Sequence, residues 1–388
     1  MSVLNISEYM TLGIVAKGRN PVFKVRNLYT GKEYALKKVR RTDYSEHLSD
    51  FQEVLSVSSC VHPNILKILG FSLSQTRSSN NNEYIINILM DLMDKDLAQE
   101  IRERQKTNNH FQKVEMAKIT VSLVSALEFM QQKRKLAHRD LKPENVLLNQ
   151  EGEIFLADFG DSFLMTDMRD TARTLVGKHF RNFLCLYLLL ILGSPYYMSP
   201  ELKEIYITGD TTEDFKYDPW KSDVYALGMT LMDAACLKLG QKNTSKAECF
   251  KHIAEIYGEE YAELLSLMLE ETIETRCDFI QLARNPLFVK LKMDQNEVNV
   301  KLSQKEQKSE APQQVKKDKC SIKTSEKLYN FIEKLPKTTK LGKFYQFLSK
   351  IKKIEETKME LDIKIKRNEE NDLNEKVPED YFKYFDCQ

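Results

Sequence analysis

One polar segment, His138-Arg-Asp-Leu-Lys-Pro-Glu-Asn145, constrains the fold of this chain more than any other part of the sequence. It follows a stretch from Gln112 to Gln131 whose apolar residues recur every three or four positions, a spacing that predicts a helix. Asp140 brings a carboxylate that can accept a proton, and Lys142 brings an ammonium that can neutralise negative charge. The alternative is a plain polar turn between a helix and a strand, which eight residues in this order disfavour.

A second motif, Asp158-Phe-Gly160, comes thirteen residues after Asn145 and follows the apolar segment Ile154 to Ala157. Together the two motifs resemble the catalytic and metal-binding segments of the protein-kinase superfamily. The resemblance implies that Asp140 orients and deprotonates an attacking hydroxyl, and that Lys142 stabilises the transferred phosphoryl group. It further implies that Asn145 and Asp158 bind Mg²⁺, which prefers oxygen ligands. A lysine at position 142 is typical of the Ser/Thr branch.

Tyr34-Ala-Leu-Lys37 alternates as a strand does, so Ala35 and Lys37 share one face while Lys38 lies on the other. By resemblance, Lys37 pairs with the α- and β-phosphates of ATP. Its expected partner is Glu53, counted back from His62-Pro-Asn-Ile65, a segment similar to the one that follows the corresponding helix in many kinases.

The glycine-rich loop departs from the family pattern. Val15 replaces the middle glycine, while Gly13 and Gly18 keep the outer ones, and an alternative register begins at Gly18. A side chain at this point obstructs the approach of backbone N–H groups to phosphates. The resemblance alone assigns the other nucleotide contacts. Met90 is the expected gatekeeper, Asp91 and Met93 lie in the expected hinge, and Leu147 is the expected floor of the adenine pocket. The remaining expected contacts are Leu12, Val22 and Ala35.

Ser199-Pro-Glu201 resembles the motif that closes the activation segment, which also includes Ser194. In the family this glutamate pairs with a distant arginine, for which Arg276 is the candidate. Arg139 beside Asp140 indicates a loop ordered by a phosphate, because a guanidinium near the base favours an anion. We expect Thr174, or else Thr171, to be phosphorylated there, by an upstream kinase.

Residues 178–193 do not fit the family pattern, and deleting them joins Gly177 to Ser194 in a typical kinase sequence. The segment has sixteen residues, or 48 nucleotides, and codons for its borders are compatible with splice sites. We therefore hypothesise a translated intron. The alternatives are a membrane-touching loop or a partner-docking loop, although an exposed run this apolar favours aggregation.

The fold class implied by the resemblance is α+β, with a small, mainly β N-lobe at residues 9–92 and a larger, mainly helical C-lobe at 93–289. The insert 178–193 lies within this kinase domain, 9–289. Residues 290–388 form a charged tail, partly disordered and partly helical. Apolar residues at 344–365 recur at helical spacing, which fits a helix that docks on the catalytic domain or on a partner, a weak coiled coil, or a tail without a specific role.

Composition excludes several other classes of protein. The net charge of +1 argues against a nucleic-acid binder, and the longest apolar run is too short to span a membrane. Seven cysteines without CxxC spacing, and no secretory signal, indicate reduced thiols. We expect a cytoplasmic protein, with the nucleus left open.

The sequence therefore predicts a kinase that uses ATP and Mg²⁺ to phosphorylate serine and threonine hydroxyls of protein substrates. Two alternatives stay open. A pseudokinase scaffold would bind partners without turnover, which Val15 and the apolar insert favour and the complete set of catalytic polar residues disfavours. A dual-specificity kinase would also phosphorylate tyrosine.

Overall fold

The computed structural model describes residues 2–18, 20–41, 60–77, 82–160, 162–164, 195–208, 217–240 and 245–295. The chain divides into two units, residues 1–316 and 317–388. All described residues belong to the first unit, so the predicted tail helix at 344–365 lies outside them.

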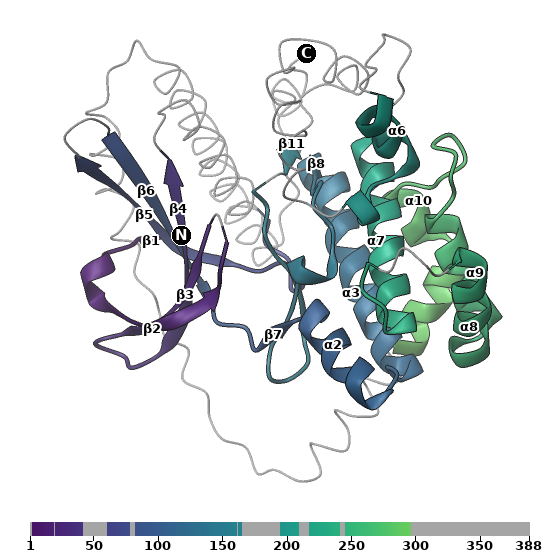
Figure 1. The fold of residues 1–388 in the computed structure, drawn as a ribbon, viewed down its shortest axis with the longest axis horizontal. Coiled ribbons are helices and arrows are strands. Elements are labelled where there is room, and N and C mark those ends of the chain that lie inside the picture. The colour runs from purple at the N-terminus through teal and green to yellow at the C-terminus, as the bar shows by residue number, and fades with distance from the viewer. Residues whose placement is uncertain are drawn as a thin grey trace, which may run out of the picture. The chain divides into compact units, whose positions relative to one another are not determined.

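The N-terminal part of the described chain is one six-stranded sheet with the order β1-β5-β6-β4-β3-β2 (Figure 1). Its strands are β1 Ser2–Val3, β2 Tyr9–Ala16, β3 Val22–Asn27, β4 Glu33–Arg41, β5 Ile68–Arg77 and β6 Asn82–Asp91. A short 3₁₀ turn, Ile6–Glu8, joins the first two strands. All neighbouring pairs are antiparallel except β1 with β5, and β4 lies centrally between β3 and β6. The strand predicted at Tyr34 to Lys37 is confirmed, because these residues lie within β4.

The remaining described residues are mainly helical, as predicted for the C-terminal lobe (Figure 1). The helices are α2 Leu97–Thr107, α3 Lys113–Phe129, α6 Pro200–Thr208, α7 Pro219–Cys236, α8 Lys246–Tyr257, α9 Glu259–Met268 and α10 Phe279–Arg284. The helix predicted at 112–131 is α3, which continues into a π turn, Met130–Arg134. At its N-terminus, Gln112 and Glu115 form reciprocal side-chain contacts with the backbone, which satisfy donors that the first turn leaves open.

Helix α7 is the centre of the helical part. Nearly all of its residues are buried, as expected for a helix that is apolar on all sides. Asp218 begins it by accepting hydrogen bonds from the backbone N–H groups of Trp220 and Lys221. Side chains fixed on α7 can therefore position the loops that pack around it.

The segments between the large sheet and the later helices contain several short strands. They are β7 Lys95–Asp96, β8 Leu136–Ala137, β9 Val146–Leu148, β10 Ile154–Leu156 and β11 Phe163–Leu164. They form a three-stranded sheet, β10-β9-β7, and a pair, β11-β8. Ile65 forms a parallel bridge with Leu156, and the Asn64 side chain donates to the Ile154 carbonyl over 2.9 Å. The segment before β5 is thus bonded directly to the strand that leads into Asp158.

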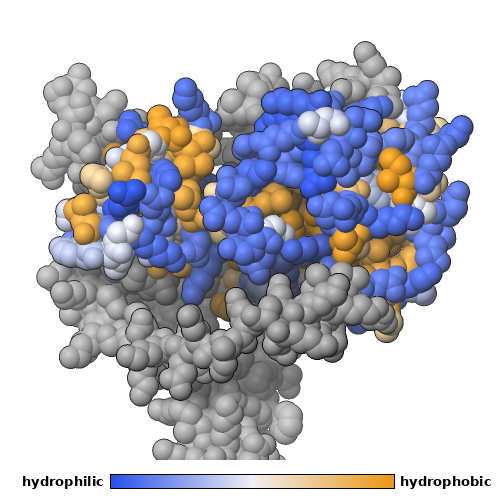
Figure 2. Space-filling view, turned by 90° about the horizontal axis from the view of Figure 1, so that it is seen from below, coloured by the Kyte–Doolittle hydropathy of each residue, from blue (hydrophilic) through white to orange (hydrophobic). Residues whose placement is uncertain are grey.

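Figure 2 shows one face of the protein, on which apolar residues appear as separate patches among hydrophilic ones. This pattern is expected where each helix packs only one side inward. Within the described ranges, no helix is both long and apolar enough to cross a membrane.

Candidate active site

The catalytic loop lies between β8 and β9, and it brings Asp140, Lys142 and Asn145 together. The Lys142 ammonium donates to both carboxylate oxygens of Asp140, over 2.8 and 2.7 Å. The Asn145 amide nitrogen donates to the Asp140 carbonyl over 2.6 Å and to its Oδ2 over 2.8 Å. Pro143 begins a 3₁₀ turn, Pro143–Asn145, which turns Asn145 back toward Asp140. Base, cation and metal-ligand candidates therefore form one hydrogen-bonded group.

One residue on α7, Asp223, holds the catalytic loop through its backbone. The carboxylate of Asp223, on α7, accepts hydrogen bonds from the backbone N–H groups of His138, over 2.6 Å, and Arg139, over 2.8 Å. Arg139 has a φ of 70°, a left-handed conformation that is costly for a residue with a side chain. Because both N–H groups point at one carboxylate, Asp223 stabilises this conformation just before Asp140. Asp223 thus supports the catalytic loop.

His138 joins the catalytic loop to the Asp158 motif. Its ring is fully buried, with Nε2 3.0 Å from the Ala157 carbonyl oxygen, and burial lowers its pKa. A neutral ring with Nε2 protonated donates to that carbonyl, while Nδ1 accepts from the Asp140 N–H over 3.3 Å. The Phe159 ring packs against His138 with the ring centroids 5.0 Å apart. The two motifs are therefore fixed to each other through buried groups.

Lys37 and Asp158 form the ion pair that joins the sheet to this loop. The Lys37 ammonium lies 2.8 Å from Asp158 Oδ1, and the side chains are 8% and 47% exposed. Partial burial alone would raise the pKa of Asp158, but the Lys37 ammonium more than offsets it, so the pKa falls to about 2. The carboxylate is therefore ionised at neutral pH.

The Asp140 group and the Lys37–Asp158 pair also act on each other electrostatically. Burial lowers the pKa of Lys142, but the carboxylates of Asp140 and Asp158 raise it more, so it is above its ordinary value. The backbone also connects the two groups, since the Ala157 N–H donates to the Asn145 carbonyl over 2.9 Å. All four residues on which the kinase prediction depends, Lys37, Asp140, Asn145 and Asp158, thus belong to one region.

The donor set fits a hard divalent cation. The two candidate metal ligands are a carboxylate, Asp158, and an amide, Asn145. Asp158 makes its hydrogen bonds to Lys37 and to the Gly160 N–H through Oδ1, so Oδ2 is the oxygen that would bind a metal ion. Asn145 uses its amide nitrogen to bond Asp140, which leaves its amide oxygen as the metal-binding atom. Within the described part of the chain, no group of three or more His, Cys, Asp or Glu side chains is arranged to hold a metal alone.

The predicted adenine contacts lie on adjoining strands. Ala35 is directly opposite Met90 in the pairing of β4 with β6, and Tyr34 is opposite Asp91. Leu147, on β9, pairs with Asp96 on β7, just after the predicted hinge. Ala35 is buried, and Met90, Asp91, Met93 and Leu147 are half-buried.

The predicted phosphate loop is the hairpin of β2 and β3. Leu12, Gly13 and Val15 lie on β2, Gly18 lies in the connection, and Val22 begins β3 opposite Lys37. A Cβ added at Gly13 would meet no described atom within 4 Å, so packing does not require glycine there. The Val15 side chain is 54% exposed and does not anchor the hairpin. A ligand that approaches the backbone would account for the glycine.

Glu201 and Arg276 form the pair that the resemblance implied. Arg276 donates from both terminal nitrogens to the two Glu201 carboxylate oxygens, over 2.8 and 3.0 Å. Arg276 is fully buried and also donates to backbone carbonyls, including that of Lys221. Such a bidentate pair fixes the start of α6 to the loop after α9.

Several predicted residues lie outside the described residues, so their roles stay predictions. These are Glu53, Thr171, Thr174, Ser194 and the insert 178–193.

The sequence motifs did not reveal one buried carboxylate, Asp233 on α7. Its carboxylate accepts hydrogen bonds from the hydroxyls of Tyr196 and Tyr197. The available signal was an acidic residue inside an otherwise apolar helix, which requires a hydrogen-bonding partner.

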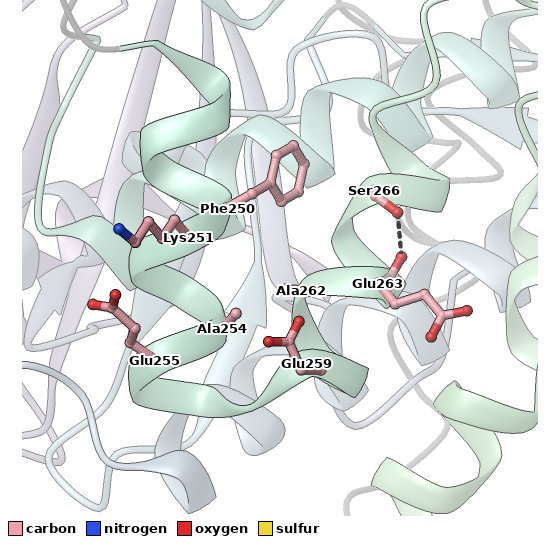
Figure 3. Close-up of a pocket in the computed structure, with 8 residues that line it drawn as sticks. All are labelled: Phe250, Lys251, Ala254, Glu255, Glu259, Ala262, Glu263 and Ser266. Carbon is pink, nitrogen blue, oxygen red and sulfur yellow. Dashed lines mark hydrogen bonds between the residues drawn. The ribbon is translucent and has the colours of Figure 1, made fainter.

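A shallow groove of about 620 Å³ lies between α8 and α9, away from the catalytic loop (Figure 3). Its lining residues are Phe250, Lys251, Ala254, Glu255, Glu259, Ala262, Glu263 and Ser266. No residue of the catalytic loop lines this groove.

Comparison with known proteins agrees with this geometry. Residues 9–340 match the family model described as the protein kinase domain. The chain is 28% identical over 276 residues to Serine/threonine-protein kinase 10 of Homo sapiens, covering 68% of this chain and 25% of that protein. It is 27% identical over 292 residues to Serine/threonine-protein kinase Nek4 of Mus musculus, covering 72% and 32%. It is 28% identical over 243 residues to human Dual specificity mitogen-activated protein kinase kinase 7, covering 61% and 50%. The matches thus span a quarter to a half of these relatives.

Proposed function

Because the chain belongs to the protein kinase domain family, we propose that it transfers the γ-phosphoryl group of Mg·ATP to serine and threonine hydroxyls of proteins. The observation that carries this proposal is the convergence of Lys37, Asp140, Asn145 and Asp158. An ammonium, two carboxylates and an amide are the groups that phosphoryl transfer requires for positioning and charge stabilisation.

Each polar side chain has a distinct role in this proposal. Asp140 accepts the proton of the attacking hydroxyl, since its carboxylate is held in place by Asn145 and Lys142. Lys142 is placed to move from Asp140 toward the negative charge that develops on the phosphoryl oxygens. Lys37 binds the phosphates that precede the transferred group. Asn145 and Asp158 would hold Mg²⁺, which neutralises phosphate charge when bound.

The choice of serine and threonine rests on Lys142 and on the relatives. Lysine at this position is typical of the Ser/Thr branch, and two of the three relatives named above are called serine/threonine kinases. The third is called dual-specificity, so transfer to tyrosine is the second candidate.

The same proposal includes regulation and location. An upstream kinase would phosphorylate Thr174 or Thr171, and the tail at 344–365 would bind a partner. The described cysteines Cys236, Cys249 and Cys277 are free thiols, which supports a cytoplasmic location.

Transfer of labelled phosphate to a general protein substrate tests the function. The purified protein, made with and without residues 178–193, is incubated with Mg·ATP, and the product is subjected to phosphoamino-acid analysis. We expect phosphoserine and phosphothreonine. Phosphotyrosine in a comparable amount would establish dual specificity instead.

A scaffold without turnover predicts a different outcome. Val15, in place of a loop glycine, is the described residue that favours it. Stabilisation by Mg·ATP without transfer, in protein already phosphorylated at Thr174, would replace the kinase proposal with a pseudokinase.

A further inference from the structure

Two histidines that take no part in the catalytic loop lie side by side in the helical part of the protein. His110 lies in the connection between α2 and α3, and His252 lies on α8. Their ring centroids are 5.0 Å apart, and the ring planes are tilted by 59°. Both side chains are half-buried, so the rings are held by their surroundings and still reached by solvent. We call these two residues the histidine pair.

The surrounding structure fixes both the position and the tautomer of His110. Its backbone carbonyl accepts a hydrogen bond from the Arg104 guanidinium over 3.4 Å, and Arg104 is held in turn by two hydrogen bonds to the Glu115 carboxylate. The ring Nδ1 lies 3.2 Å from the carbonyl oxygen of Ala235, near the end of α7. Because a carbonyl oxygen can only accept, Nδ1 carries the proton, and Nε2 of the neutral ring keeps its lone pair.

His252 supplies a second imidazole lone pair. Burial, His110 and Lys238 lower the pKa of His252, although Glu255 opposes this shift, so the ring is mostly neutral at neutral pH. A neutral imidazole has one nitrogen that carries a lone pair. Within the described part of the chain, the His252 side chain makes no hydrogen bond, so this nitrogen is open to an ion.

The separation of the two rings matches that of two imidazoles bound to one metal ion. A metal–nitrogen distance of about 2.0–2.1 Å places each ring centroid about 3.2 Å from the ion, so two centroids in a tetrahedral site lie about 5 Å apart. The observed separation is 5.0 Å. A hydrogen bond from the second ring nitrogen to a backbone carbonyl, as His110 makes to Ala235, is also what orients metal-binding histidines.

We propose that His110 and His252 together bind one divalent transition-metal ion, of the class that favours imidazole ligands and includes Zn²⁺. The ion would join the α2–α3 connection to α8. Within the described residues, no group of three or more His, Cys, Asp or Glu side chains is arranged to hold a metal, so water fills the other positions and binding is reversible. The oxygen ligands of Asn145 and Asp158 suit Mg²⁺ instead, and the proposal does not depend on the kinase function.

The test compares the melting temperature of the full chain with and without about 100 µM ZnCl₂, in excess Mg²⁺ throughout. The variants are His110→Asn, which keeps an N–H donor for the Ala235 carbonyl, and His252→Gln. His62→Asn is the matched control, because its half-buried ring packs on Phe129, with centroids 5.4 Å apart. We expect Zn²⁺ to raise the melting temperature of wild type and His62→Asn by about 3 °C, the shift for an ion at about ten times its dissociation constant. Each variant of the pair should shift by less than about 1 °C.

Calorimetric titration with ZnCl₂ gives a second readout, which counts ions and needs no unfolding. Thiols elsewhere in the chain also bind Zn²⁺, so the quantity that decides is the difference between variants. We expect each single variant to lose one ion per chain relative to His62→Asn, and the double variant to lose no more, because both histidines share one ion. His252→Gln decides alone if His110→Asn fails to fold. The same zinc shift and stoichiometry in His252→Gln as in wild type, or no shift in wild type, would overturn the site and leave a plain contact between two rings.

Discussion

At the scale of single residues, the partners in the Lys37–Asp158 pair differ in exposure. The Lys37 side chain is 8% exposed, whereas Asp158 is 47% exposed. Removing a buried ammonium relieves its desolvation, and the remaining carboxylate is accessible to water. Asp158 can therefore tolerate the loss of the Lys37 ammonium, because water reaches its carboxylate.

We predict that Lys37→Met lowers phosphoryl transfer by about 100- to 1000-fold, the loss expected when one preorganised charge is removed. Thermal unfolding should change little. The control is Lys38→Met, because the neighbouring Lys38 lies over the Phe23 ring, 4.8 Å from its centroid, and not at Asp158. Equal losses of activity in both variants would contradict the assignment of Lys37.

Arg276 and Glu201 show the opposite balance, because both are buried and bonded to each other. We predict that Arg276→Met lowers the free energy of unfolding by about 3–5 kcal/mol, since it leaves the Glu201 carboxylate buried without its cation. The double variant Arg276→Met, Glu201→Met should recover part of this loss.

Urea unfolding measures these changes. Arg284→Met serves as the control, because Arg284 is exposed and its replacement should cost well under 1 kcal/mol. If Arg276→Met were no more destabilising than Arg284→Met, the pair would not be structural.

Residue-level prediction from sequence worked where the partners are close in the chain. Asp140, Lys142 and Asn145 lie within six positions, so their spacing alone placed them in one loop. Glu201 and Arg276 are 75 positions apart and came from resemblance. The contact between Tyr197 and Asp233 spans 36 positions and matched no motif, so the sequence pattern did not reveal it.

At the scale of elements, α7 carries a buried carboxylate whose pKa responds to its surroundings. Burial raises the pKa of Asp223 to about 7, although the N–H groups of His138 and Arg139 and the charge of Arg139 lower it, and Asp218 raises it slightly. The folded state therefore holds a proton on Asp223 between about pH 4 and 7, where the unfolded state does not.

The sign of the pH effect follows from this difference. Stability contributed by Asp223 is fully present below about pH 4 and is lost as the pH rises toward 7. We predict that the stability of wild type relative to Asp223→Asn falls over this window, by at most about 1.4 kcal/mol per pH unit. Urea unfolding at several pH values measures it. A constant difference would show that Asp223 is ionised throughout.

Elements with strong local patterns were predictable. The period of three and four residues from Gln112 to Gln131 predicted α3, and alternation at Tyr34 to Lys37 predicted β4. The two-residue strands β7, β8 and β11 were not predictable, because only pairing with distant strands defines them. Strand β1 was missed for the same reason, since Ser2 and Val3 gain their order by pairing with β5, outside the predicted N-lobe start at residue 9.

At the scale of the whole molecule, the two-lobed architecture could be predicted because motif order fixes which part is sheet and which is helix. The central position of α7 and the bridge of Ile65 to Leu156 could not, since both depend on how elements pack. The insert at 178–193 was inferred from a break in the motif order, and it lies outside the described residues.

We predict that the main transcript lacks the 48 nucleotides that encode residues 178–193. The physical reason is that a long apolar run within the activation segment, before Ser199-Pro-Glu201, would favour aggregation. Sequencing of the transcript decides the matter. A messenger that retains the segment as its main form would show that the insert is part of the protein.

The most direct test of the central claim is the rate of phosphoryl transfer from Mg·ATP by Asp140→Asn. Asp140 is held by Lys142 and Asn145 and is the proposed base, so the rate should fall by about 100- to 10,000-fold. Asp294→Asn, the same change at an exposed residue, should keep the wild-type rate. Transfer by folded Asp140→Asn at the rate of Asp294→Asn would contradict the account.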